Sequence, residues 1–244
     1  MSEVDVVLNE LVIANRILAN EGIVDAYGHI TARHPAKPDR FFMARMLAPE
    51  LVERADIIEF DLNGVAVDDN RGPSVERFIH AAILEARPEL QAVVHAHAED
   101  TLAFGITGAP LRPVIHSGSF IGAHVPVWDI ANNFGDTDLL VRNMAQGRDL
   151  ARCLANNNVA LMRGHGFAAA ARSIIEVVRI AVYLPRNARV QLAAMQIGAY
   201  KPLYDGEIAA RSAGYKPYGD QTWRAWEYWA NRAGCLHMLG ERPV

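Results

Sequence analysis

The chain has 244 residues, of which 51% are hydrophobic and 21% are charged, and its formal net charge is −4. This balance is typical of a globular protein that can bury a sizeable core, in one large domain or two small ones. The mildly negative charge, without any dense run of lysine and arginine, argues against nucleic acid as a partner and against attraction to an anionic membrane surface.

The cysteine content and the N-terminal residues indicate the compartment. Only Cys153 and Cys235 are present, without a C-x-x-C motif, so the sequence predicts neither a disulfide framework nor a thiolate metal site. Residues 1–5 are acidic, whereas a secretory or transit peptide is basic, and no uninterrupted apolar stretch reaches the length of a membrane span. We therefore expect a cytoplasmic protein in a reducing environment, with no membrane partner.

The N-terminal third predicts a helix followed by antiparallel strands. Apolar residues recur at helical spacing over residues 4–20, and Gly22 ends the pattern. Short β-like segments follow at 29–33, 40–46 and 56–62. The last of these leads into Asn63-Gly64, a hairpin-turn signal, and then into residues 65–67.

Helices and strands then alternate along the chain. Ser74 is a plausible N-cap for a helix that ends before Pro88, and a strand carrying two histidines follows. We expect later elements at 100–104 (helix), 111–116 (strand), 138–154 (helix), 159–163 (strand), 173–198 (helix) and 222–232 (helix), with an extended arm over 201–220. No repeat or linker is visible, so we expect one α/β domain over 1–200. Residues 201–244 would form a C-terminal arm and helix that pack on the same or a neighbouring subunit.

The motif His95-Ala96-His97 is the strongest chemical signal in the sequence. Alternate side chains of a strand share one face, so the two imidazoles can point at a single ion. A third histidine, His165, lies between Gly164 and Gly166, which allow a close backbone approach. Three histidines with an open coordination position are typical of a catalytic metal site, although strand histidines are often only packed and the glycines could simply form a turn.

Glu76 and His80 add a carboxylate and another imidazole. We expect both on one face of the helix that precedes the histidine strand, at i and i+4, with Glu76 one turn inside the helix. A first-turn acid is also favoured by the helix dipole alone. For His80 we prefer the interpretation of a hydrogen-bonded core histidine.

Taken in order, Glu76 with His80, residues 87–97 and residues 163–166 resemble the class II aldolase/adducin family over roughly residues 7–192. The resemblance implies a single three-layer α/β/α domain with a central, largely antiparallel sheet. It also implies a homotetramer with active sites between adjacent subunits. In the family's enzymes three histidines, matching His95, His97 and His165, hold a divalent cation, and the glutamate matching Glu76 moves a proton and can ligate the metal.

The chain departs from the sugar-phosphate aldolases of that family. Those enzymes normally carry a Gly-Asn-Ile-Ser segment and a Thr-Pro-Ser/Thr-Gly phosphate loop, whereas here the matching stretches at 28–31 and 42–46 read GHIT and FMARM. Only Ser74 remains of a Ser-Ser pair, and Ser117 stands where the aldolases commonly have a tyrosine acid. Arg45 offers a planar fork for a carboxylate instead, unless it is only a surface arginine.

These departures, and a histidine at position 29, are more similar to family members that decarboxylate hydroxylated aromatic or heteroaromatic carboxylic acids. That likeness implies a lyase with one divalent ion per subunit, Zn, Mn, Fe or Co, and a small-molecule carboxylate substrate. We take Glu76 as the first choice of proton donor and His29 as the second, with substrate contacts from Arg45, Ser74, His116 and Tyr218. An aldolase or epimerase of an unphosphorylated sugar-like or hydroxy-oxo acid, and a non-catalytic adducin-like binding module, stay open.

Overall fold

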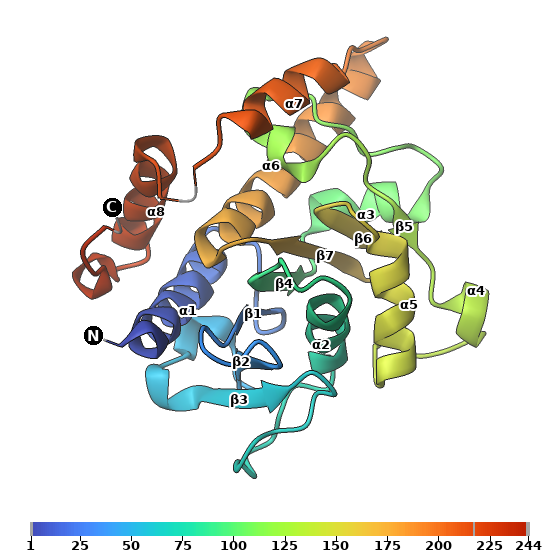
Figure 1. Ribbon diagram of the computed structural model, residues 1–244. Coiled ribbons are helices and arrows are strands. Elements are labelled where there is room, and N and C mark those ends of the chain that lie inside the picture. The colour runs from blue at the N-terminus through green and yellow to red at the C-terminus, as the bar shows by residue number, and fades with distance from the viewer. Residues whose placement is uncertain (1, 217, 243–244) are drawn as a thin grey trace.

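A seven-stranded sheet forms the centre of the computed structural model, which describes residues 2–216 and 218–242 (Figure 1). The strand order is β3-β2-β1-β4-β7-β6-β5, and every neighbouring pair is antiparallel except β5 with β6. The strands are β1 (His29–Arg33), β2 (Arg40–Ala44), β3 (Ile57–Asp61), β4 (Ala92–Ala96), β5 (Val127–Trp128), β6 (Val159–Met162) and β7 (Gly166–Ala171).

Helices cover both faces of this sheet (Figure 1). One core lies between the sheet and the helices α1 (Glu3–Asn20), α3 (Glu99–Ile106) and α6 (Ile174–Ile197). A second core lies against the opposite face, under α2 (Arg77–Ala86) and α5 (Met144–Leu154). The predicted three-layer α/β/α fold with a largely antiparallel sheet is confirmed. The remaining segments are α4 (Ala131–Phe134), α7 (Asp205–Ala213), α8 (Asp220–Arg232), η1 (Pro49–Leu51), η2 (Arg54–Asp56), η3 (His116–Ile121) and η4 (Leu236–Met238).

Strand β4 positions the histidine pair. It is fully buried, with β1 on one side and β7 on the other. Its side chains alternate between the two cores, so that Val94 and Ala96 face the α1 and α6 side while Val93 faces α2. His95 therefore shares the α2 side with Val93, as the period of two requires.

Strand β7 is alanine-rich and was not among the predicted elements. Residues 168–171 are all alanine, a residue favoured in helices, so its local preference does not indicate a strand. The strand forms because it lies between β4 and β6 and pairs with both. Its first residue, Gly166, packs so closely on β4 that an added Cβ would lie 2.2 Å from the carbonyl oxygen of Ala96.

Two predicted helix starts were wrong. Helix α2 begins at Arg77, so Glu76 occupies the N-cap position and is not one turn inside the helix, and Ser74 is not the N-cap. The Ser74 hydroxyl instead accepts a hydrogen bond from the Glu76 amide at 3.3 Å, in the turn before the helix. Helix α5 begins at Met144 because Asn143 caps it by accepting from the Gln146 amide, so the predicted start at residue 138 was six residues early.

Two predicted extended segments were also wrong. The strand expected over 111–116 does not form, because Pro113 lacks an amide donor and the neighbouring amides donate to side chains of α6. Those acceptors are Gln191 Oε1 for Arg112 and Asn187 Oδ1 for Val114. The arm expected over 201–220 contains α7, which Glu207 starts by accepting from the Tyr204 amide.

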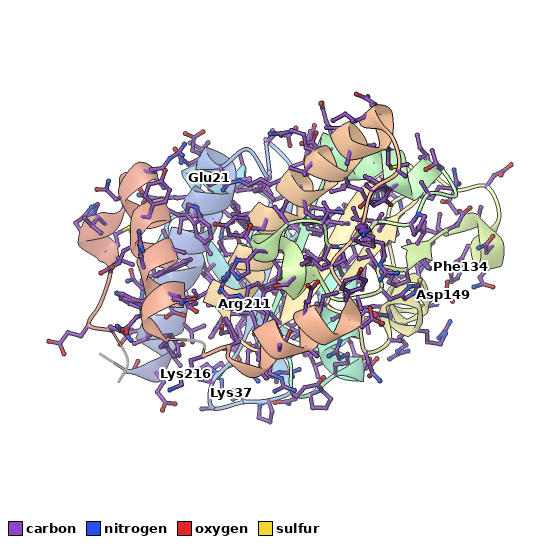
Figure 2. All side chains as sticks on the ribbon, turned by 90° about the horizontal axis from the view of Figure 1, so that it is seen from above. Glu21, Lys37, Phe134, Asp149, Arg211 and Lys216 are labelled. Atoms are coloured by element: carbon purple, nitrogen blue, oxygen red, sulfur yellow. The ribbon has the colours of Figure 1, made fainter. Side chains whose placement is uncertain are left out.

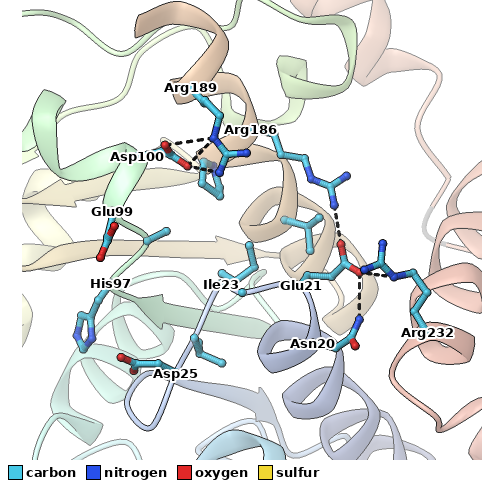
Figure 3. Close-up of a pocket in the computed structure, with 15 residues that line it drawn as sticks. Asn20, Glu21, Ile23, Asp25, His97, Glu99, Asp100, Arg186, Arg189 and Arg232 are labelled. Carbon is cyan, nitrogen blue, oxygen red and sulfur yellow. Dashed lines mark hydrogen bonds and ion pairs between the residues drawn. The ribbon is translucent and has the colours of Figure 1, made fainter. Parts of the chain in front are cut away.

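The C-terminal helix α8 packs against α1 of the same chain. The side chains of Trp226 and Trp229 are buried in the core on that side of the sheet. Glu21, at the end of α1, forms ion pairs with Arg186 of α6 at 2.5 Å and with Arg232 of α8 at 3.3 Å (Figure 3). Among the described residues, no helix combines the length and apolar character that a membrane span requires.

Candidate metal centre and active site

Four predicted ligands converge at one end of the sheet. His95 lies near the end of β4, His97 follows that strand, His165 is in the β6–β7 turn and Glu76 precedes α2. One potential ligand atom from each of the four lies within 4.8 Å of every other. The Nε2 atoms of His95 and His97 are 3.0 Å apart, and Glu76 Oε2 lies 3.5 Å from His95 Nε2 and 3.6 Å from His165 Nε2.

These spacings fit a divalent ion. Ligand bonds of about 2 Å in tetrahedral coordination place neighbouring ligand atoms about 3.3 Å apart. The three measured separations lie close to that edge length. His95 Nδ1 donates to the carbonyl oxygen of Phe167 at 3.0 Å if that nitrogen carries the proton, which leaves Nε2 free as a ligand. The donor set of three imidazoles and one carboxylate suits Zn, Mn, Fe or Co.

The electrostatics keep these groups in the forms that bind metals. Burial lowers the pKa of His165 to about 4 and also lowers the pKa of His97, so both rings are neutral at pH 7. Burial raises the pKa of Glu76, but the hydrogen bond with His95 and the neighbouring imidazoles outweigh it and hold that pKa well below its usual range. A neutral imidazole and an ionised carboxylate are the ligating forms of these side chains.

The two oxygens of Glu76 have different partners. Oε1 accepts a hydrogen bond from the Val141 amide at 3.1 Å, while Oε2 faces the imidazoles. Val141 was not among the predicted site residues, since an apolar residue acting through its backbone leaves no chemical signal in the sequence. This contact fixes the carboxylate so that one oxygen points to the centre of the cluster.

A chain of hydrogen bonds leads from the core to the site. Thr31 Oγ1 lies 2.9 Å from His80 Nδ1, and His80 Nε2 lies 2.7 Å from His29 Nδ1. His80 is completely buried. It is hydrogen-bonded in the core as we preferred, and it also contacts the predicted catalytic residue His29. The ring of His29 packs beside His95, with centroids 5.2 Å apart.

A cavity of about 360 Å³ opens beside the cluster. It brings together five predicted site residues, which are His29, Arg45, Ser74, Glu76 and His97. Its other walls are largely apolar and include Met43, Met46, Leu47 and Leu140. Arg45 donates from Nε to Asp56 at 2.8 Å, and its side chain stays 37% exposed.

Two predicted substrate contacts lie away from this cavity. His116 begins η3 and Tyr218 lies between α7 and α8, and neither lines the cavity within the described chain. Substrate binding by His116, and contact of Tyr218 with the substrate of a neighbouring subunit, stay predictions. On another side of His97 lies a larger cavity of about 520 Å³, where Asp25, Glu99 and the Glu21 ion pairs are found (Figure 3).

Comparison with known proteins agrees with this geometry. Residues 9–192 match the model of the class II aldolase and adducin N-terminal domain. The chain belongs to the class II aldolase and adducin family. The match spans the whole sheet and all four residues of the cluster.

Two curated relatives indicate which activity of that family this chain resembles. A protein named decarboxylase tropJ, from Talaromyces stipitatus, is 40% identical over 204 residues, which cover 78% of this chain and 77% of that protein. A 3,4-dihydroxyphthalate decarboxylase of Arthrobacter keyseri is 29% identical over 82% of this chain and 83% of the relative. The prediction of a lyase is therefore confirmed, with decarboxylation favoured over aldol cleavage.

Solved structures confirm the fold. An aldolase II superfamily protein from Pseudomonas syringae aligns with a TM-score of 0.78 at 24% identity, over 96% of this chain and 94% of that one. An L-fuculose 1-phosphate aldolase aligns with a TM-score of 0.72 at 20% identity, over 87% of this chain and 97% of that one.

Proposed function

We propose that this family member is a divalent-metal-dependent decarboxylase of a hydroxylated aromatic or heteroaromatic carboxylic acid. The observation that carries the proposal is the four-residue cluster of His95, His97, His165 and Glu76 at the edge of a largely apolar cavity. The similarity to two proteins named as decarboxylases supports the reaction class.

These four side chains would hold the ion. Zn, Mn, Fe or Co bound there would supply a Lewis acid for the negative charge that develops as the carboxylate leaves. The protein contributes the fixed ligand positions, through the bond of His95 to Phe167 and that of Glu76 to Val141.

The cavity walls suit an aromatic carboxylate. Methionine and leucine side chains provide an apolar surface for a ring, and Arg45 extends free guanidinium donors beyond its contact with Asp56. Ser74, also in the wall, is a further hydroxyl for a polar substituent. In this arrangement Arg45 binds a second carboxylate of the substrate, which is not the one that leaves as CO₂.

Proton delivery is assigned to His29 in this proposal. The bond between the ring carbon and the carboxylate breaks, CO₂ leaves, and the electron pair stays on the carbon until it takes a proton. Glu76 is ionised and engaged by Val141, which suits a ligand better than an acid. His29 lines the cavity, and its Nδ1 is held by His80, so Nε2 is the nitrogen that faces a substrate. Burial lowers the pKa of His29, so its imidazole is neutral, and it would take the proton of the substrate hydroxyl at Nε2 and return that proton to the ring carbon after CO₂ leaves.

The assembly belongs to the same proposal. We infer a homotetramer in which His116 and Tyr218 contact the substrate of an adjacent subunit. Analytical ultracentrifugation of the purified protein tests the oligomeric state, and a monomer at micromolar concentration contradicts it.

A substrate screen after metal reconstitution tests the activity. Protein stripped by a chelator and reloaded with Mn, Zn, Co or Fe is offered hydroxybenzoates, dihydroxyphthalates and hydroxypyridine carboxylates, and released CO₂ is measured. We expect turnover that His165→Ala abolishes and that His237→Ala, at an exposed histidine of η4, leaves unchanged. Carbonyl products without CO₂ would support aldol cleavage instead, and failure of every metal to bind would remove the basis of the proposal.

A further inference from the structure

Two arginines from different helices lie against one aromatic ring, away from the four potential metal ligands. The guanidinium carbon of Arg179, on α6, lies 3.9 Å from the ring centroid of Phe120, and that of Arg211, on α7, lies 5.3 Å from the same centroid. Phe120 belongs to η3. The function proposed above uses none of these three residues.

The Arg179 side chain is buried, and the charge of Glu176 on the same helix acts to raise its pKa without forming an ion pair with it. The residue is only 7% exposed, and its Nε has no hydrogen-bond partner among the described residues. Within the same part of the chain, neither Arg179 nor Arg211 forms an ion pair. Burial and the charge of Arg211 both lower the pKa of Arg179. Buried charges in proteins are normally paired, and contact with an aromatic face offsets only part of the desolvation cost.

Other donors point to the same place. Nε of Arg211 is also buried without a hydrogen-bond partner in the described residues, and the buried hydroxyl of Tyr215 has Ser173 as a neighbouring hydrogen-bonding group. Burial raises the pKa of Tyr215, so the phenol keeps its proton and can donate. Two unpaired guanidinium nitrogens, from α6 and α7, and the buried phenol that follows α7 thus belong to side chains that line one cavity.

A cavity of about 230 Å³ lies between these groups. Lys216 adds a third cation to its lining, and Figure 2 shows Lys216 and Arg211 on the side of the molecule where α7 ends. The one lining carboxylate in the described residues, Asp220, is paired with Arg242 at 2.5 Å. The lining of the cavity therefore carries a net positive charge, and its volume accommodates a single small anion.

We propose that Arg179, Arg211, Tyr215 and Lys216 form a binding site for a small oxyanion, carried by inorganic phosphate or by an aryl carboxylate. The guanidinium forks match the paired oxygens of either group, and the buried phenol supplies a further donor. The site shares no lining residue with the cavity beside the metal cluster. It joins α6 to α7, so the bound anion stabilises the C-terminal segment.

Calorimetric titration of the full-length protein at constant ionic strength tests the site. Inorganic phosphate and phthalate are titrated separately, with chloride as the ionic control. We expect saturable binding of at least one of the two anions. The anion with the lower dissociation constant shows whether the site prefers a phosphate or an aryl carboxylate. Arg211→Gln should weaken that binding at least tenfold, while Arg224→Gln, at an exposed arginine of α8, should leave it unchanged.

A second measurement guards against misfolding of the variants. Arg211 is partly exposed, so Arg211→Gln should keep the wild-type circular dichroism spectrum, and Arg179→Gln repeats the test at the buried position. Equal binding by wild type and both variants, or no saturable binding by the wild type, overturns the proposal. Loss of oligomerisation in Arg211→Gln without any anion binding also overturns it, because the cations would then pair with a second copy of the chain.

Discussion

His29 and His80 share a hydrogen bond of 2.7 Å between Nδ1 of His29 and Nε2 of His80. His80 is itself held by Thr31, so the orientation of the His29 ring is set by a buried side chain that does not line the cavity. In the role proposed for His29, one ring nitrogen is committed to the protein and the other is available to the substrate.

Replacing His80 should therefore reduce turnover more than substrate binding. We expect His80→Ala to lower kcat about 100-fold, because a misoriented acid loses the advantage of its position, with a smaller change in KM. His80→Gln, which keeps a polar atom near the position of Nε2, should recover part of the rate. Steady-state kinetics check this, and a KM effect without a kcat effect would contradict the positioning role.

Removing the metal should lower thermal stability. An ion present at 100 times its dissociation constant stabilises the folded state by about 2.7 kcal/mol. For a chain of this size, that free energy corresponds to a fall in Tm of about 5–10 °C. Differential scanning calorimetry with and without a chelator checks this. Identical melting curves for the loaded protein and the stripped protein would speak against a bound ion.

Arg45→Ala should raise KM about tenfold or more with little change in kcat, because the proposed contact with a second carboxylate would be made in the ground state and the transition state alike. Asp56→Asn is the matched variant, since it removes the partner that holds Arg45 and keeps the guanidinium. We expect a smaller rise in KM for it. An unaltered KM in Arg45→Ala would show that Arg45 is a surface residue that does not bind the substrate.

Glu10 should make the protein less stable as the pH rises. Burial raises the pKa of this α1 carboxyl from 4.5 to about 7, so the folded state holds a proton that the unfolded state releases. The contribution of Glu10 to the free energy of unfolding is then greatest below pH 4.5, falls between 4.5 and 7, and is lower above 7 by at most about 3 kcal/mol. Glu10→Gln should flatten this slope in urea denaturation from pH 4.5 to 8. A slope as steep as the wild-type one would exclude Glu10 as its source.

Gly166→Ala should displace side chains of the candidate metal site. The new Cβ would lie 2.2 Å from the Ala96 carbonyl oxygen and 3.1 Å from His97 Cδ2, so the β4–β7 pairing and the His97 ring cannot both stay in place. We expect a Tm several degrees lower and weaker metal binding. Gly206→Ala, in α7 with no atom within 4 Å of the new Cβ, should be neutral or slightly stabilising. Equal behaviour of the two variants would show that the tight contact is not needed.

The sequence predicted those parts of the site that depend on strand periodicity and residue chemistry. His95 and His97 share a face because of the period of two in an extended chain, and their ligand character is intrinsic to imidazole. The contact between Val141 and Glu76 could not be predicted, because it joins a backbone amide to a side chain 65 residues earlier. The failed strand at 111–116 has the same origin, since its amides are satisfied by Asn187 and Gln191, far along the chain in α6.

The bond from the Val141 amide to Glu76 connects the ligand cluster to the irregular stretch 135–143 that leads into α5. A cation held by Oε2 would restrain this carboxylate further, so we expect the Val141 amide to exchange with solvent more slowly in the metal-loaded protein. Deuterium uptake at this single backbone position would then distinguish the loaded protein from the stripped one. Mass spectrometry of peptides covering Val141 would report metal loading in a cell extract, where no substrate needs to be known.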